Sequence, residues 1–222
     1  EGLGTPLFDR GARAVRLTAF GEGFLGRARE VLRLTGELEG LGRVSKGHLA
    51  GRLRMGVIPT VAPYLLPQVI AELTQAYPGL DLQLRETITP KLLAELAEGR
   101  LDCAIVALPV SEPSLTEVAL FAEDFVLVRP LRDAGLPEPN ADMLRAMRLL
   151  LLEEGHCFRD QALSFCKRQS LRPRELLDGS SLTTLVQMVG AGIGVTLIPE
   201  MAVAVETRSA PVAVAGFPAP GP

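Results

Sequence analysis

The pattern of hydrophobic and polar positions predicts one long helix near the start of the chain. From Ala19 to about Gly42 the apolar residues recur at helical spacing, and Thr18 stands where it would cap the first turn. No sheet or second helix follows closely enough in the sequence to bury the apolar stripe. We therefore expect this helix to pair with a second copy of itself. The stripe consists of Phe20, Phe24, Ala28, Val31, Leu32, Leu38 and Leu41.

A small basic hairpin is expected before this helix. The Asp-Arg-Gly sequence at residues 9–11 is a turn signal, and a short segment rich in Arg, Val and Leu follows it. Residues 43–51, which contain two glycines, a serine, a lysine and a histidine, are expected to form a hinge.

Beyond the hinge, strand-like and helical patterns alternate. This order predicts an α/β protein with two lobes of roughly 80 residues each and a cleft between them. The apolar run at residues 103–108 is typical of a strand that is covered on both faces. The expected strands are 53–58, 80–84, 103–108, a segment near 119, 124–128, 148–152 and 194–198, and the expected helices are 61–77, 90–99, 159–168 and 182–190.

Composition and charge narrow the class of protein. With 47% hydrophobic and 22% charged residues, the 222-residue chain has the composition of a soluble globular protein, and its longest apolar stretch, 185–199, is too short and polar to span a bilayer. Residues 1–54 carry ten basic and six acidic side chains, whereas the remainder carries thirteen and twenty. A basic head on an acidic body is typical of a nucleic-acid-binding module joined to a sensor, although solvated charge also fluctuates by chance. We expect a cytoplasmic protein, no membrane partner, and a chain that begins inside a longer protein.

The segment Leu7–Arg10 together with Val15–Gly21 resembles the end of the winged helix-turn-helix domain of LysR-type transcriptional regulators. The resemblance implies a wing, a linker helix that pairs two subunits, and a two-lobed effector domain shaped like a periplasmic binding protein. The implied boundaries are 1–18 for the C-terminal part of the winged helix-turn-helix, 19–42 for the linker helix, 43–51 for the hinge and 52–222 for the redox-sensing effector domain. On the wing, Arg10, Arg13 and Arg16 would contact DNA phosphates.

Three further segments resemble the members of this family that sense hydrogen peroxide: Ile58–Pro67, Gly99–Cys103, and Gly155–Ala162 with Phe165-Cys166. The resemblance implies a disulfide between Cys157 and Cys166 that changes the conformation and controls antioxidant genes. The implied partners are promoter DNA, hydrogen peroxide, RNA polymerase, cellular thiol systems that reduce the protein, and further copies of the chain in a dimer or tetramer.

The cysteine segment carries a geometric argument of its own. Three cysteines in a cytosolic protein do not suggest a disulfide scaffold, and the Cys157–Cys166 spacing fits neither a zinc knuckle nor a Cys-x-x-Cys motif. On a continuous helix, nine residues advance about 13.5 Å and end on the opposite face. A disulfide requires Cα atoms about 4.4–6.8 Å apart. If the two thiols join, residues 158–165 must therefore unwind.

Cys157 is the expected peroxidatic thiol, because His156 and Arg159 are close in sequence and a helix is expected to start just after it. Cys166 is then the expected resolving thiol. Cys103, in its apolar strand, is expected to pack inertly in the core. With only two histidines, His48 and His156, we expect no metal, and no cofactor is expected either.

Peroxide also requires hydrogen-bond donors that stabilise its leaving oxygen. Thr60 and Thr89 each stand at an expected strand-to-helix turn, where they would either bind peroxide or merely cap helices. Asp160 would orient His156 or Arg159. Two other functions remain open: a LysR-type regulator that binds a small organic anion through Thr60 and Ser181, and a thiol peroxidase. We expect a regulator rather than an enzyme, because a peroxidase has no use for a basic wing and a dimerising helix.

Overall fold

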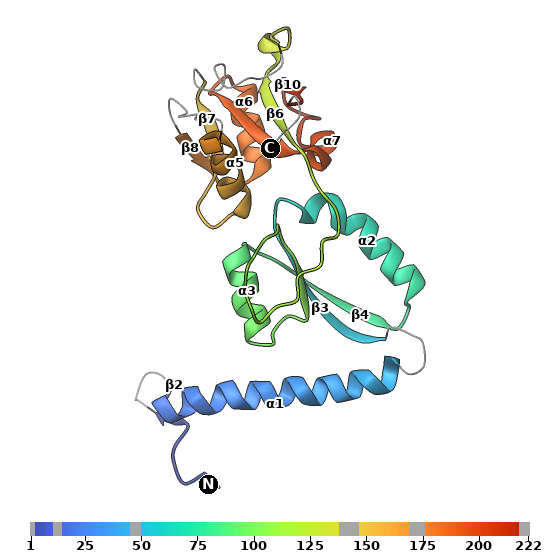
Figure 1. The fold of residues 1–222 in the computed structure, drawn as a ribbon, viewed down its shortest axis with the longest axis vertical. Helices are drawn as coiled ribbons and strands as arrows, with labels where there is room; N and C mark the ends of the chain where they lie inside the picture. Colours follow the sequence, from blue (N-terminus) through green and yellow to red (C-terminus); the bar gives the residue numbers. More distant parts are fainter. Residues whose placement is uncertain (1–2, 11–14, 45–49, 138–146, 169–175, 218–222) are drawn as a thin grey trace.

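A hairpin, a long helix and two α/β lobes follow one another along the chain (Figure 1). The computed structural model describes residues 3–10, 15–44, 50–137, 147–168 and 176–217. Within these ranges no helix has the length and hydropathy needed to cross a membrane. Besides the two-stranded hairpin, the described residues form a three-stranded and a five-stranded sheet, which confirm the predicted α/β class with two lobes.

The hairpin and the long helix form as the sequence predicts. Strands β1 (Phe8–Arg10) and β2 (Val15–Leu17) pair antiparallel, and helix α1 runs over Ala19–Val44. Thr18 caps α1, because its Oγ1 accepts a hydrogen bond from the Gly21 amide at 2.9 Å. Gly21 itself is required here, since a Cβ at this position would lie 2.1 Å from the carbonyl oxygen of Leu7.

The expected hinge at 43–51 is shorter at both ends than predicted. Helix α1 extends to Val44 and the first strand of the next lobe begins at Gly51, while residues 45–49 lie outside the described ranges. In Figure 1, α1 lies apart from both lobes. Side chains of its apolar stripe, including Phe24, Val31 and Leu32, are exposed within this single chain.

The first lobe is a three-stranded parallel sheet in the order β4-β3-β5, with two helices. Two small apolar clusters cover its faces: Met55, Val57 and Ala62 form one, and Ile58, Leu92 and Leu101 form the other. Its elements are β3 (Gly51–Val57), α2 (Ala62–Ala76), β4 (Leu80–Glu86), α3 (Thr89–Ala97) and β5 (Cys103–Ile105).

Strand β5 differs from the expectation. The apolar run at 103–108 forms a strand only as far as Ile105, and this strand lies at the edge of the sheet. Cys103 is exposed, so the expectation that it packs in the core was wrong. An apolar run does not by itself place a strand inside a sheet, and β5 pairs with β3 alone among the described residues. The expected extended segment near residue 119 forms no strand in the described part of the chain either.

The second lobe contains a five-stranded mixed sheet in the order β10-β6-β9-β7-β8. Strand β7 runs parallel to both β8 and β9, whereas β6 pairs antiparallel with β9 and β10. Its elements are β6 (Phe125–Pro130), β7 (Leu149–Leu152), α5 (Cys157–Arg168), β8 (Leu176–Gly179), α6 (Leu182–Gly190), β9 (Val195–Pro199), α7 (Val203–Glu206) and β10 (Val212–Ala215), with short 3₁₀ turns at Leu131–Asp133 and Glu200–Ala202.

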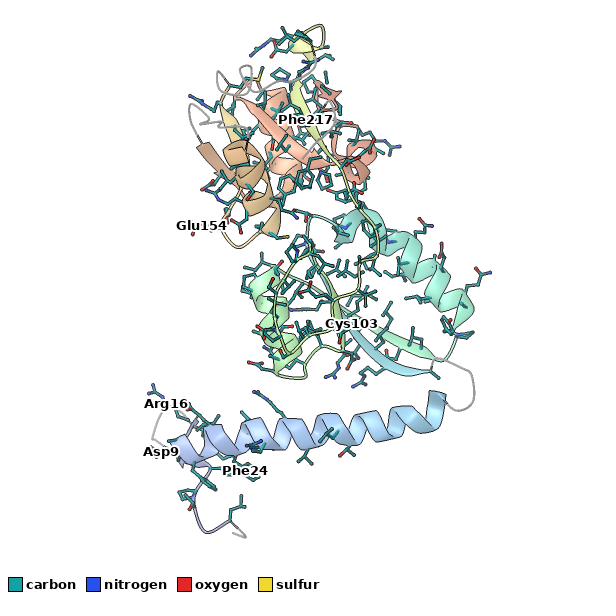
Figure 2. The ribbon with its side chains drawn as sticks, viewed as in Figure 1. Asp9, Arg16, Phe24, Cys103, Glu154 and Phe217 are labelled. Atoms are coloured by element: carbon teal, nitrogen blue, oxygen red, sulfur yellow. The ribbon has the colours of Figure 1, made fainter. Side chains whose placement is uncertain are left out.

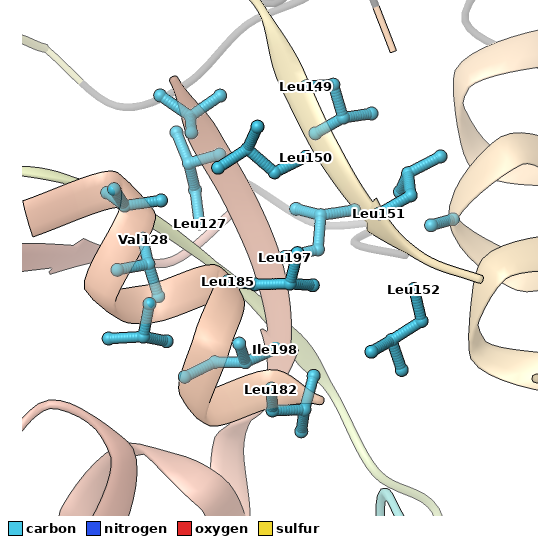
Figure 3. Packing of buried hydrophobic residues seen from close by; sticks show 14 of the residues in the cluster. Leu127, Val128, Leu149, Leu150, Leu151, Leu152, Leu182, Leu185, Leu197 and Ile198 are labelled. Carbon is cyan, nitrogen blue, oxygen red and sulfur yellow. The ribbon is translucent and has the colours of Figure 1, made fainter. Parts of the chain in front are cut away.

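The core of this lobe explains the run of four leucines at 149–152. All four are buried, because β7 lies inside the sheet with α5 on one face and α6 on the other (Figure 3). Each fully buried leucine contributes about 1.5–3 kcal/mol. On α5, Phe158 and Ala162 enter the same core, and the Phe158 ring packs 4.8 Å from that of Phe125. This packing fixes the first turn of α5, where Cys157 lies.

Candidate functional site

Cys157 is the first residue of helix α5. The turn before it contains Gly155, whose φ of 94° lies in the left-handed region that glycine adopts most readily. The free backbone N–H groups of the first helical turn favour negative charge, so the position suits a thiolate. Cys157 is half-buried and unpaired.

Although Cys157 belongs to the second lobe, it packs on the first. Its side chain lies against the apolar cluster of Ile58, Leu92 and Leu101. Next to it, a Cβ on Gly155 would lie 2.8 Å from Cδ1 of Ile88, so the turn before α5 also rests closely on the first lobe. The site is therefore split between the two lobes.

A cavity of about 810 Å³ opens beside Cys157, with a mostly apolar lining. Thr60, Cys157 and Gln161 are polar or nucleophilic members of this lining, and β5 and the chain after it form much of the rest. Thr89, His156, Arg159 and Asp160 do not line it. Hydrogen peroxide, with two oxygen atoms, would occupy only a small part of this space.

Thr60 and Thr89 follow neighbouring parallel strands. Thr60 is 4% exposed in the turn between β3 and α2, and Thr89 is the first residue of α3, just after β4. Because Val57 at the end of β3 pairs with Glu86 at the end of β4, the two turns lie at the same edge of the sheet. The Thr89 hydroxyl is buried and has no hydrogen-bond partner among the described residues. A buried hydroxyl without a partner is rare in proteins and is available to a bound ligand.

His156 and Arg159, the expected cationic neighbours of Cys157, interact with groups other than its thiol. Burial lowers the pKa of His156 from its ordinary value, and the charge of Glu153 only partly opposes this shift. The imidazole is therefore neutral at pH 7. Arg159 donates a hydrogen bond to the Leu152 carbonyl at 2.8 Å and forms an ion pair with Asp178, so its guanidinium fastens α5 to β7 and β8. Asp160 is exposed, and no bond to His156 or Arg159 is formed in the described structure.

Cys166 follows nine residues later on the same continuous helix. The backbone separation is therefore the one the sequence argument assumed, about 13.5 Å along the axis. The side chain of Cys166 lies outside the described part of the structure. Cys103 lies on strand β5, where partial burial and Asp102 raise the pKa of its thiol (Figure 2). A raised pKa leaves less of the reactive thiolate.

On the hairpin, Arg16 is exposed and lies near the start of α1 (Figure 2). The backbone of Arg10 belongs to β1, but its side chain is not described, and Arg13 falls entirely outside the described residues.

The sequence interpretation missed two features of the site. Gln161 lines the cavity together with Cys157, and the spacing of four residues, which places both on one helix face, could have indicated it. The close approach of Ile88 to Gly155 had no signal in the sequence, because the two belong to different lobes. Among the described residues, no group of three or more His, Cys, Asp or Glu side chains could hold a metal ion.

A family model described as the LysR substrate binding domain matches residues 46–222. Because this match spans well over half of the chain, the protein belongs to the LysR family of transcription regulators.

Curated relatives place it more closely within that family. A "Probable hydrogen peroxide-inducible genes activator" from Streptomyces viridosporus is 45% identical over 230 residues, which cover 100% of this chain and 73% of the relative. The "DNA-binding transcriptional dual regulator OxyR" of Escherichia coli K12 is 40% identical over 210 residues, or 93% of this chain and 68% of that protein. Among the LysR regulators, the chain thus groups with OxyR.

Solved structures agree with this grouping. A full-length OxyR cysteine mutant from Pseudomonas aeruginosa superposes with a TM-score of 0.80 at 36% identity, covering 100% of this chain and 72% of that one. A hydrogen peroxide-bound OxyR mutant from Corynebacterium glutamicum gives a TM-score of 0.76 at 36% identity, covering 97% of this chain and 69% of that one.

Proposed function

We propose that this protein is a DNA-binding transcription regulator that senses hydrogen peroxide through Cys157 and Cys166 and controls antioxidant genes. One observation carries the proposal. Cys157 lies at the N-terminus of α5 and packs on the first lobe, and a second cysteine follows nine residues later on the same helix. The names of two relatives, an activator of hydrogen peroxide-inducible genes and a DNA-binding transcriptional regulator, support the proposal.

The chemistry would proceed in two steps. The Cys157 thiolate attacks one oxygen of hydrogen peroxide, the O–O bond breaks, and the leaving hydroxide takes up a proton to become water. Cys157 is then a sulfenic acid. The Cys166 thiol next attacks this sulfur, the S–S bond forms, and the sulfenic oxygen leaves as a second water. No other oxidant is required.

Thr60 and Thr89 are proposed to bind peroxide and donate hydrogen bonds to its leaving oxygen. The buried, unpartnered hydroxyl of Thr89 supports its part in this role. His156, neutral because burial lowers its pKa, is proposed to exchange protons with the reacting groups rather than to supply a positive charge. Arg159 is proposed to act on the site through helix α5, by its bonds to Leu152 and Asp178. The expected role of Asp160 in orienting His156 or Arg159 stays a prediction, since Asp160 is exposed and forms no bond to either in the described part of the chain.

Disulfide formation would change the conformation of the sensing lobes, and α1 would carry this change to the DNA-binding heads. We propose a dimer through α1, assembled further into a tetramer, because the exposed stripe of α1 needs a partner. Arg10, Arg13 and Arg16 would contact promoter DNA. The remaining proposed partners are RNA polymerase and the cellular thiol systems that reduce the disulfide. Both act in the cytoplasm, where we propose that this protein also acts.

The organic-anion alternative has less support. It relied on Ser181 at the N-terminus of α6, but the Ser181 hydroxyl already accepts the Thr184 amide at 3.2 Å as the helix cap. The remaining alternative is a thiol peroxidase. Such an enzyme would consume peroxide in repeated catalytic cycles, whereas a regulator would change conformation once oxidised.

Alkylation and peptide mapping before and after stoichiometric peroxide test the proposal. We expect one internal Cys157–Cys166 link in the wild type, a sulfenic acid trapped by a dimedone-type probe in Cys166→Ser, and no oxidation of Cys103. A wild type without the link would contradict the proposal. Continuous consumption of excess peroxide with a thiol donor would instead identify a peroxidase.

A further inference from the structure

A hydrogen bond joins a helix of the first lobe to a helix of the second. The hydroxyl of Tyr64, on α2, donates to Oε1 of Glu206, at the end of α7, over 2.7 Å. The Tyr64 ring also packs against the core cluster of the second lobe, although its helix belongs to the first. The two residues are 142 positions apart in the chain.

The bond compensates a buried carboxylate. Glu206 is 7% exposed, and it forms no ion pair with any described residue. A carboxylate in such surroundings requires hydrogen-bond donors, because burial removes its water. Burial and the bond to Glu206 raise the pKa of Tyr64, so the phenol stays protonated and remains a donor. The phenol is therefore the donor and the carboxylate the acceptor of this bond.

Tyr64 is also close to the candidate site along the chain. Thr60 lies in the turn that leads into α2 at Ala62, and Tyr64 lies in the first turn of that helix, where its amide donates to the Val61 carbonyl. Thr60 thus belongs to a segment whose next turn is anchored in the second lobe. The opposite side of the site, Cys157, belongs to the second lobe itself. Since the site is split between lobes, its geometry depends on contacts that fix one lobe against the other.

We infer that Tyr64 and Glu206 form a positioning pair that fixes Thr60 relative to Cys157, both of which line the cavity, and thereby sets the rate at which peroxide oxidises Cys157. Neither residue lines the cavity beside Cys157, and the Tyr64 hydroxyl is already bonded to Glu206, so the pair acts by positioning other residues. The inference rests on the proposed function. It adds a specific requirement, namely that the hydroxyl–carboxylate contact between lobes controls the reaction.

The experiment uses the protein with Cys103→Ser and Cys166→Ser, so that Cys157 is the one cysteine left of the three in this sequence, and its oxidation is followed by peptide mapping. In this background Tyr64→Phe keeps the ring and removes the donor, Glu206→Ala removes the acceptor, and Glu206→Gln keeps an acceptor oxygen. Tyr77→Phe is the matched control, because Tyr77 is the only other tyrosine of the chain and is exposed at the end of α2. Two rate constants are measured for each variant: oxidation of Cys157 by hydrogen peroxide and alkylation by iodoacetamide.

We expect Tyr64→Phe and Glu206→Ala to slow oxidation by peroxide about tenfold or more, since small displacements of reacting groups are costly. Alkylation, which does not use Thr60, should change less than about twofold by the same reasoning. Glu206→Gln and Tyr77→Phe should react with peroxide much as the background does.

Two results would overturn the inference alone: peroxide rates unchanged in Tyr64→Phe and Glu206→Ala, or peroxide and alkylation rates that fall in parallel, which would indicate a general loss of structure. Failure of Glu206→Gln to restore the rate would also count against a hydrogen-bonding role. If peroxide does not oxidise Cys157 in the background protein at all, the proposed function fails, and the inference fails with it.

Discussion

Arg159 ties helix α5 to the sheet of the second lobe, and this helix must unwind before Cys157 and Cys166 can join. Its Nη1 donates to the Leu152 carbonyl at 2.8 Å and pairs with Asp178, so one side chain ties α5 to two strands of the second lobe. The Arg159 side chain is 14% exposed, whereas that of Asp178 is 49% exposed. The bond to the carbonyl is therefore well shielded, and the ion pair is partly screened by solvent.

Replacing Arg159 with Gln should loosen α5. A hydrogen bond from a charged donor contributes about 1.5–3 kcal/mol, and a half-exposed ion pair adds about 0–1 kcal/mol. Because glutamine retains part of the packing and solvent replaces part of the bonding, we expect a net loss near the lower limit, about 1.5–2 kcal/mol. Since each 1.4 kcal/mol is a factor of ten, the fraction of open helix should rise about ten- to thirtyfold.

Two measurements follow for Arg159→Gln. Hydrogen exchange across residues 158–165 of the reduced protein should accelerate by this factor, and the disulfide should close faster once Cys157 is a sulfenic acid. Asp160→Asn is the control, because Asp160 is exposed on the same helical turn, so its loss should accelerate exchange much less than the loss of Arg159 does. Exchange that stays at the wild-type rate in Arg159→Gln would refute the fastening role. Failure to form the sulfenic acid would show instead that Arg159 serves the thiolate.

The remaining predictions concern assembly, DNA and pH. Phe24→Glu with Val31→Glu places charges in the exposed stripe of α1, and sedimentation should then show a smaller species than the wild type. Neutralising Arg10 and Arg13 together should reduce the salt slope of DNA binding by about two if each contacts one phosphate, and an unchanged slope would remove them from the interface. Because burial lowers the pKa of His156, the unfolded chain binds its proton first, so this residue should reduce folding stability as the pH falls below about 6.5. His156→Gln should lose that part of the pH dependence in a series of thermal midpoints.

Local patterns predicted most of the elements but not their neighbours. The helical period of residues 20–41 and the cap at Thr18 were enough to predict α1, because both signals lie within a few residues of one another. The apolar run at 103–108 was misleading for the opposite reason. Whether such a strand lies at the centre or the edge of a sheet depends on distant segments, and β5 lies at the edge.

For the candidate site, too, the sequence predicted local positions but not the contacts between distant segments. The sequence indicated Cys157, Thr60 and Thr89 from their places at helix starts, and the structure has all three at or beside such starts. It also suggested that Arg159 neighbours the thiolate, since the two are close in sequence, whereas the guanidinium contacts Leu152 and Asp178. The contacts of Gly155 with Ile88 and of Tyr64 with Glu206 join different lobes, and no local pattern encodes them.

The central claim is that peroxide acts by joining two cysteines whose backbones are separated by nine residues, about 13.5 Å along the axis, on helix α5. Hydrogen exchange across residues 158–165, measured on reduced protein and on oxidised protein whose link has been mapped by mass, tests this claim most directly. We predict protected amides in the reduced form and a clear change in their exchange once Cys157 and Cys166 are joined. An oxidised protein that carries the Cys157–Cys166 bond with unaltered exchange in this segment would contradict the account.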